Sequence, residues 1–288
     1  MPATPGPVTV ALEQIEVVLG HADRNRDLSI TRCDRAFEAG ADIVVLPELA
    51  ISGYVVDEDA ARRLAEPLDG PSTAAFIDAA SRYGGLVVFG WCETDGEDLY
   101  NSVLAVNGDG PVLHYRKLHL FDREKAVYTP GNLGLPVVDT AYGVIGVCIC
   151  YDLRFVEVLR TLSLQGADLV LAPAAWVAGF DKKVPARGRT GHADSILAQA
   201  NLDQVAVVAV SQVAGSDPHG PQTLGGSVAC DAFGELVAGP LSRTEADSAL
   251  ATISIEDTRA ARVRSTTIRP REDRRTDVYR VQYAGKSW

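Results

Sequence analysis

The chain has 288 residues, of which 47% are hydrophobic and 23% charged. This is ordinary globular composition and excludes disordered and fibrous proteins. With 27 basic against 38 acidic residues the net charge is −11, so nucleic acid is a poor partner for the chain as a whole. No stretch of about 18 uncharged apolar residues and no signal peptide are visible, and we expect a cytoplasmic protein that does not bind membranes.

Strand-like and helix-like segments alternate along the chain. The strand-like ones are short, rich in Val, Ile and Leu, and bounded by Gly, Pro, Asn or Asp. Several are apolar throughout, as in strands that are covered on both faces. The pattern predicts an α/β protein with strands at 8–12, 42–46, 86–91, 102–107, 144–150, 168–172, 205–210, 227–231 and 249–255, and helices at 22–39, 72–83, 154–165 and 191–203.

One internal repeat is visible. Residues 40–47 (GADIVVLP) and 166–173 (GADLVLAP) both follow a predicted helix and both have the order Gly, strand, Pro. They suggest two similar halves, although such corners also recur by chance in α/β proteins. Because no Gly/Ser-rich linker interrupts the chain, we expect one domain over residues 1–260. The tail at 261–288 has eight Arg or Lys against three Asp or Glu, and we expect it to pack on the acidic body or on a partner subunit.

The five cysteines do not suggest a disulfide framework, because their number is odd and no secretory signal is present. Cys148 and Cys150 form the one close pair, and no histidine lies at zinc-ligand spacing from them. A redox or metal-sensing pair is therefore a weak alternative. The fingerprints of nucleotide, dinucleotide, zinc-protease and serine-hydrolase sites are missing. We expect neither a metal ion nor an organic cofactor.

Polar or aromatic side chains follow several predicted strands, where α/β proteins collect their ligand sites. Glu48 follows the second strand, Cys150 ends the fifth, and Trp176 follows the sixth. Lys117 lies beyond a polar turn at 107–110. Taken singly, each has an ordinary alternative role as a helix cap, a buried thiol, packing or a solvated charge.

Taken together, five ordered motifs resemble the nitrilase, or carbon–nitrogen hydrolase, superfamily. The resemblance runs from about residue 7 to 257 and rests on residues 46–54 (LPELAISGY), 115–121 (YRKLHLF), 124–131, 146–155 (GVCICYDLRF) and 226–234. It implies a four-layer αββα sandwich of two stacked mixed sheets. It also implies subunits that pair across helices, so we expect a homodimer or a higher homo-oligomer.

The resemblance assigns the catalytic Glu, Lys and Cys to Glu48, Lys117 and Cys150, and a second glutamate to Glu124. It favours Cys150 over Cys148 because the Tyr-Asp-Leu-Arg of the motif follows Cys150 directly. For Glu124 the alternative is a member of a solvated charge run.

The residue types account for a reaction. A free thiol is mostly protonated at neutral pH; a nearby ammonium favours the thiolate and a carboxylate takes the proton. We hypothesise that Glu48 is the general base and that Cys150 attacks an amide carbonyl. Lys117 and the backbone N–H of Tyr151 would hold the oxyanion, and Glu124 would position the water that hydrolyses the thioester.

Four further residues are candidates for substrate binding. Tyr54 and Trp176 would form walls of the pocket or would simply pack. Arg154 either pairs with Asp152 at the nucleophile turn or binds a substrate carboxylate. His192 is a lone histidine near a helix start, a place more typical of a cap or a surface residue than of a catalyst.

The chain length and the Cys-Tyr-Asp sequence resemble the amidase and carbamoylase branches of the superfamily. The predicted function is cysteine-dependent hydrolysis of a carbon–nitrogen bond in a small linear amide, with release of ammonia. The alternative is an N-carbamoyl (ureido) substrate; a nitrilase, an acyl transferase and a catalytically silent relative are less favoured. The partner is thus a small molecule.

Overall fold

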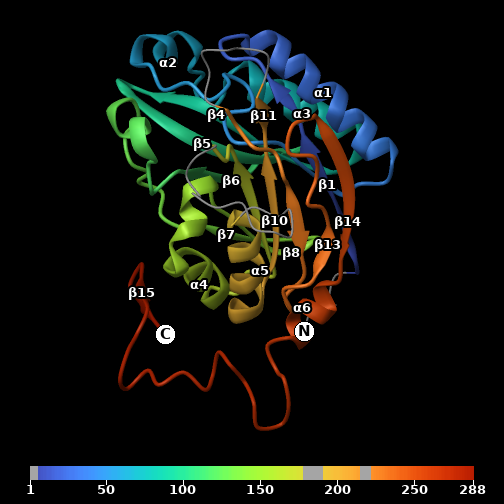
Figure 1. Ribbon diagram of the computed structural model, residues 1–288, viewed down its shortest axis with the longest axis vertical. Helices are drawn as coiled ribbons and strands as arrows, with labels where there is room; N and C mark the ends of the chain where they lie inside the picture. The colour runs from blue at the N-terminus through green and yellow to red at the C-terminus, as the bar shows by residue number, and fades with distance from the viewer. Residues whose placement is uncertain (1–5, 178–190, 215–221) are drawn as a thin grey trace.

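Two six-stranded mixed sheets face each other in the computed structural model, which describes residues 6–177, 191–214 and 222–288 (Figure 1). In order across the first sheet the strands are β14 (Asp247–Ile253), β1 (Val8–Gln14), β3 (Ile43–Val45), β4 (Leu86–Asp95), β5 (Asp98–Asn107) and β6 (Gly110–Arg116). Across the second they are β13 (Leu236–Ala238), β12 (Val228–Cys230), β10 (Ala206–Ser211), β9 (Leu169–Ala174), β8 (Gly143–Val147) and β7 (Val137–Thr140). The central strands β1, β3 and β4, and likewise β8, β9 and β10, run parallel.

Helices cover the outer face of each sheet. The helices α1 (Ala22–Glu38) and α3 (Pro71–Tyr83) pack on the first sheet, and α4 (Val156–Leu164) and α5 (Gly191–Asp203) pack beside the second. The alternation within β3 shows why. Ile43 and Val45 point into the core between the sheets, whereas Val44 points toward the core under α1 and α3. These layers confirm the αββα sandwich.

Shorter elements complete the described chain. They are α2 (Glu58–Leu64), α6 (Ile255–Ala260), the 3₁₀ turns η1 (Asp122–Ala126) and η2 (Cys150–Arg154), and the two-residue strands β2 (Glu16–Val17), β11 (Val213–Ala214), β15 (Gln282–Tyr283) and β16 (Lys286–Ser287). No helix in the described part of the chain is long and apolar enough to cross a membrane.

All the predicted strands and helices are present, with ends that differ by a few residues. One difference matters for the site: the strand predicted at 144–150 ends at Val147, and Cys150 opens the turn η2. The sequence prediction missed β6, β7, β13 and α2, whose patterns are short or interrupted by charged residues.

The internal repeat corresponds to one central strand in each sheet. α1 leads through Gly40 into β3, and α4 leads through Gly166 into β9. Both glycines have positive φ, 94° and 107°, a backbone conformation that glycine adopts without a steric penalty at a helix end. The repeat therefore corresponds to two equivalent strands, β3 and β9. Glu48 follows the carboxyl end of β3, and Trp176 follows that of β9.

The basic tail leaves α6, runs extended along one end of the molecule and returns at the hairpin of β15 and β16 (Figure 1). Two of its arginines bind the body of the same chain. Arg262 pairs with the buried Asp168 at 2.7 Å, and Arg271 donates to the carbonyl oxygens of Asp203 and Gln204 at 3.0 and 2.9 Å. The tail is therefore joined to the body by an ion pair and by hydrogen bonds to backbone carbonyl oxygens.

Glu13 on β1 provides a test of the fold by pH. It is buried, its Oε2 has no hydrogen-bond partner among the described residues, and Arg32 lies 3.6 Å away. Burial raises the pKa of Glu13 from 4.5 to about 7. As pH rises through this range the unfolded chain loses the proton first, so the free energy of unfolding falls. We expect Glu13→Gln to stabilise the protein at pH 8 by about 1–3 kcal/mol and to have little effect at pH 4.

Urea unfolding at both pH values measures this difference. Glu16→Gln, which changes an exposed glutamate on the adjoining strand β2, is the control and should alter neither value. An equal effect of Glu13→Gln at pH 4 and pH 8 would contradict the assignment.

Candidate active site

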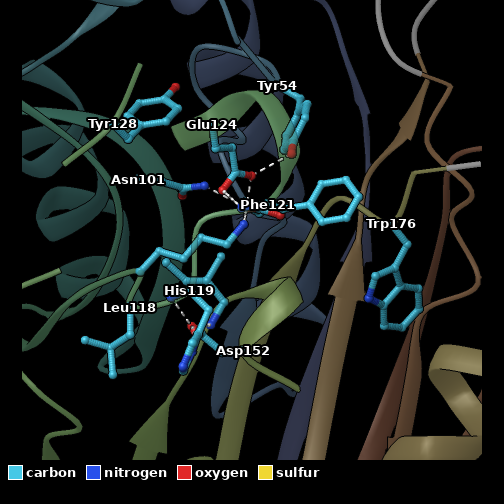
Figure 2. A network of polar contacts seen from close by, with 12 residues as sticks. Tyr54, Asn101, Leu118, His119, Phe121, Glu124, Tyr128, Asp152 and Trp176 are labelled. Atoms are coloured by element: carbon cyan, nitrogen blue, oxygen red, sulfur yellow. Dashed lines mark hydrogen bonds and ion pairs between the residues drawn. The ribbon is translucent and has the colours of Figure 1, made fainter. Parts of the chain in front are cut away.

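Three buried charged side chains from separate elements meet at one end of the sheets (Figure 2). Lys117, just after β6, places its Nζ 2.6 Å from Oε1 of Glu48 and 2.8 Å from Oε1 of Glu124. All three side chains are 0% exposed. The ordinary alternatives of a solvated lysine and a solvated charge run are therefore wrong for Lys117 and Glu124.

The two carboxylates differ in how fully they are bonded. Oε1 of Glu48 accepts from Lys117 and from Nδ2 of Asn101 at 2.7 Å, whereas its buried Oε2 has no partner among the described residues. Both oxygens of Glu124 are engaged, because Oε1 also accepts from the Tyr54 hydroxyl at 2.5 Å and Oε2 accepts from the Phe121 backbone N–H at 2.9 Å. Glu48 alone of the pair has an oxygen left to receive a proton.

The Asp152 carboxylate holds the turn that carries Cys150 in place through hydrogen bonds. Cys150 has φ of +45°, which is uncommon for a residue other than glycine. The buried Asp152 carboxylate accepts from the Ile149 backbone N–H at 2.9 Å and from the Tyr115 hydroxyl at 2.7 Å, and it lies 2.8 Å from Nδ1 of His119. Asp152 therefore joins the turn that carries Cys150 to Tyr115 and His119.

The electrostatic setting keeps the Cys150 thiol protonated at rest. Burial and the Glu48 carboxylate raise its pKa well above the ordinary value, and Lys117 and a backbone hydrogen bond from Ala175 offset this only in part. Lys117 favours the thiolate, as expected, but burial and the carboxylates outweigh it. Attack by this sulfur requires a base.

The pKa shifts of Glu48 and Lys117 suit a site in which a carboxylate takes the proton of the thiol. Burial raises the pKa of Glu48 above 4.5, and the opposing effect of Lys117 does not cancel it. For Lys117, burial works against the charged form, but Glu124 and Glu48 together raise its pKa above the usual value. The arrangement therefore combines a carboxylate of increased basicity with a fixed cation.

The backbone of Glu48 is fixed where the carboxyl ends of β3 and β9 meet. Its N–H donates to the Ala174 carbonyl at 3.3 Å, and its carbonyl accepts from Nε2 of Gln212 at 2.9 Å. Gly90 on β4 lies directly behind it. A Cβ on Gly90 would lie 2.8 Å from Cα of Glu48 and 2.6 Å from the Leu49 nitrogen, and backbone at these distances has to move.

We therefore expect Gly90→Ala to shift Glu48 and to lower kcat at least about tenfold, since small misplacements of a reacting group are costly. The measurement is steady-state turnover, with circular dichroism to establish that the variant is folded. Gly6→Ala, at a glycine with open space around it, is the control. A folded Gly90→Ala enzyme with unchanged kcat would contradict this packing argument.

A cleft with about 290 Å³ of empty space opens beside Cys150. The described residues that line it are Phe121, Cys150, Tyr151, Arg154, Ala175, Trp176, Val177 and His192. Cys150 is partly exposed there, whereas Cys148 is fully buried among core residues.

The substrate-binding candidates have different positions. Trp176 and Arg154 line the cleft, Trp176 buried and Arg154 exposed. Tyr54 is not among the described lining residues; its hydroxyl lies behind, on Glu124 (Figure 2). His192 is buried and stacks on Trp176, with ring centroids 5.2 Å apart, so the expectation of a surface position is wrong.

Sequence reasoning missed several residues that hold this site, among them Asn101, His119 and Gln212. An asparagine within an apolar strand is a signal that could have pointed to Asn101, because a buried amide needs partners. No local signal identifies Gln212. Among residues 6–177, 191–214 and 222–288, no group of three or more His, Cys, Asp or Glu side chains is arranged to hold a metal ion.

The chain is similar to proteins of one family along most of its length. The carbon–nitrogen hydrolase family profile matches residues 9–263. An (R)-stereoselective amidase from a Pseudomonas species is 32% identical over 227 residues, which cover 78% of this chain and 79% of the amidase. A nitrilase from Pyrococcus abyssi is 38% identical over 169 residues, 58% of this chain; the match spans 64% of that protein's own length.

Comparison of structures leads to the same superfamily. The crystal structure of Nit3 from Saccharomyces cerevisiae, a member of the nitrilase superfamily, superposes with a TM-score of 0.80 at 26% identity and covers 92% of this chain and 97% of its own. The family match, the two facing sheets and the buried cluster beside a cysteine agree with one another. The chain belongs to the carbon–nitrogen hydrolase family, within the nitrilase superfamily.

Proposed function

We propose that this protein hydrolyses the carbon–nitrogen bond of a small linear amide through a thioester on Cys150, with release of ammonia. The observation that carries the proposal is the buried Oε2 of Glu48, which has no hydrogen-bond partner among the described residues. Lys117 and Asn101 occupy the other oxygen and fix the carboxylate. A carboxylate of raised pKa with one oxygen available suits a general base for a protonated thiol.

The first half of the reaction forms the thioester. Oε2 of Glu48 takes the proton from Sγ of Cys150 as the sulfur bonds to the carbonyl carbon. Lys117 and the backbone N–H of Tyr151 stabilise the negative charge on the carbonyl oxygen, and each such donor typically lowers the barrier by about 3 kcal/mol. The proton then passes from Glu48 to the amide nitrogen, the carbon–nitrogen bond breaks, and ammonia leaves.

The second half hydrolyses the thioester. A water molecule gives a proton to Glu48 while the water oxygen bonds to the carbonyl carbon. The carbon–sulfur bond then breaks, Glu48 returns the proton to the sulfur of Cys150, and a carboxylic acid leaves. For Glu124 we propose a role different from the one inferred from the sequence. Because both of its oxygens are bonded, it positions the Lys117 ammonium, and it is not needed to position water.

The preference for an amide is supported by the amidase among the relatives. An N-carbamoyl compound would pass through the same steps, with the released carbamate losing carbon dioxide. Ammonia release from matched panels of aliphatic amides, N-carbamoyl amino acids and nitriles distinguishes these substrates, with Cys150→Ala as the blank. Turnover of nitriles alone, or no turnover in any panel, would contradict the proposal.

We also propose that the protein works as a homo-oligomer. The adjacent helices α4 and α5 expose two large apolar side chains to solvent, Val156 at 62% and Leu202 at 61%. Exposed apolar groups on neighbouring helices favour association with another surface. A dimeric or larger mass in light scattering at micromolar concentration is expected, and a monomeric mass would contradict this.

A further inference from the structure

Trp176 is fixed rigidly at the wall of the cleft. Its backbone N–H donates to Oγ of Ser211 at 3.1 Å, and its carbonyl accepts from the Leu224 backbone N–H at 2.8 Å. Its ring lies against His192 at an angle of 19°, and the residue is 1% exposed. A side chain held at both backbone groups and stacked on a buried ring has little freedom to reorient.

The indole nitrogen of Trp176 is left without a partner. Nε1 is buried and makes no hydrogen bond to any residue that the structure describes. A buried tryptophan N–H normally has an acceptor. Trp91, buried to the same extent, follows that rule and donates to the Glu66 carbonyl at 3.2 Å.

Trp176 forms part of the cleft wall, and its buried donor lies within that wall. In Figure 2 the nitrogen lies on the edge of the Trp176 ring that is turned toward Phe121, and both residues line the cleft together with Cys150. Of the other described lining residues, Ala175 and Val177 are apolar. The indole N–H can only donate, and an ether, hydroxyl or carbonyl oxygen can accept from it.

We propose that the Trp176 indole N–H donates a hydrogen bond to an oxygen in the acyl part of the substrate. The inference rests on the proposed function, in which Lys117 and the Tyr151 backbone N–H already bind the reacting carbonyl oxygen. The acceptor is therefore a second oxygen. The enzyme is selective for amides whose acyl chain contains an ether, hydroxyl or carbonyl oxygen over alkyl amides of equal size.

Two matched substrate pairs test this selectivity: 2-methoxyacetamide against butanamide, and 3-methoxypropanamide against pentanamide. In each pair one methylene is replaced by an ether oxygen. The ratio of kcat/KM values, ether over alkyl, is measured for the wild type and for Trp176→Phe. We expect the ratio of at least one pair to fall about five- to tenfold in the variant, which is the usual effect of one buried hydrogen bond. Comparing ratios between enzymes cancels the intrinsic reactivity of the amides.

Trp91→Phe is the control, because it makes the same change at an equally buried tryptophan in the core between the first sheet and α1 and α3. Its ratios should equal those of the wild type. If the wild type hydrolyses both members of each pair and neither ratio changes in Trp176→Phe, this inference is wrong and the amidase proposal stands. If no amide is hydrolysed, the proposed function is wrong.

A binding measurement tests the donor without turnover. In Cys150→Ala, the indole ¹H–¹⁵N signal of Trp176 is assigned from its loss on adding the Trp176→Phe change. We expect saturation with an ether amide to move this signal downfield, and the matching alkyl amide to leave it near its starting position. An equal shift with both, or no shift with either, would overturn the inference.

Discussion

Replacing Glu48 with Gln is expected to lower kcat by a factor of about 10²–10⁴, the range found for a general base. The substitution is well matched to the geometry. The Gln oxygen can still accept from Lys117 and Asn101, while an NH₂ group replaces the free Oε2. The variant therefore removes the basic oxygen and the carboxylate charge, and the hydrogen bonds to Lys117 and Asn101 can remain.

The pH dependence gives a second measure of the same residue. Because burial raises the pKa of Glu48, kcat/KM of the wild type should fall on the acid side at a pH above 4.5, and this limb should disappear in Glu48→Gln. Glu13→Gln, the same change at another buried glutamate, is the control and should retain wild-type kcat. A Glu48→Gln enzyme within tenfold of wild-type kcat would rule out the base.

Replacing Lys117 with Met is expected to destabilise the protein by about 3–5 kcal/mol at pH 7, as when one partner of a buried ion pair is removed. Lys117 is the only cation within 4 Å of Glu48 or Glu124 among the described residues. Without it, two fully buried carboxylates remain unpaired. The loss should be smaller at pH 4, because burial favours the protonated form of Glu48 in the folded variant, whose free energy of unfolding therefore rises as pH falls.

Urea unfolding measures this loss, and a second variant guards against a simple packing effect. Combining Lys117→Met with Glu48→Gln and Glu124→Gln removes all three charges, and we expect most of the lost stability to return. Both variants should be inactive. A Lys117→Met protein as stable as the wild type at pH 7 would show that the three charges do not form the buried cluster described here.

The positions of Glu48 and Cys150 could be predicted from the sequence, because each follows a short apolar strand of a recognisable kind. The two strands lead to the same edge of the molecule, one from each sheet. The strand patterns predicted an α/β protein, and the four layers followed from the family resemblance. The strand pattern therefore predicted where along the chain the site residues lie.

The environment of the site could not be read in the same way. Lys117 follows β6, a strand that the prediction missed because Arg116 and His114 interrupt its apolar pattern. Both are paired with the buried Glu93, at 2.6 and 2.9 Å, and only tertiary structure makes these charges compatible with a buried strand. The sequence predicted a protonated thiol that needs a base, but not that burial raises the pKa of Cys150 further, because burial depends on residues remote in sequence.

Gly90 and Trp176 illustrate two further kinds of missing information. The need for a glycine at 90 comes from the backbone of residues 47–49, which is distant along the chain. The unpartnered N–H of Trp176 is a property of the whole cleft wall. Sequence reasoning identified Trp176 as a candidate wall residue and could not assign its polar atom.

The most direct test of the central claim is the mass of the acyl-enzyme, measured after rapid acid quenching of the wild type with a saturating amide. We predict an increase equal to the acyl group on the peptide that contains Cys148 and Cys150. The adduct should persist in Cys148→Ala and be absent from Cys150→Ala. Ammonia release from the first turnover without any adduct on this peptide, or an adduct that remains in Cys150→Ala, would contradict the account.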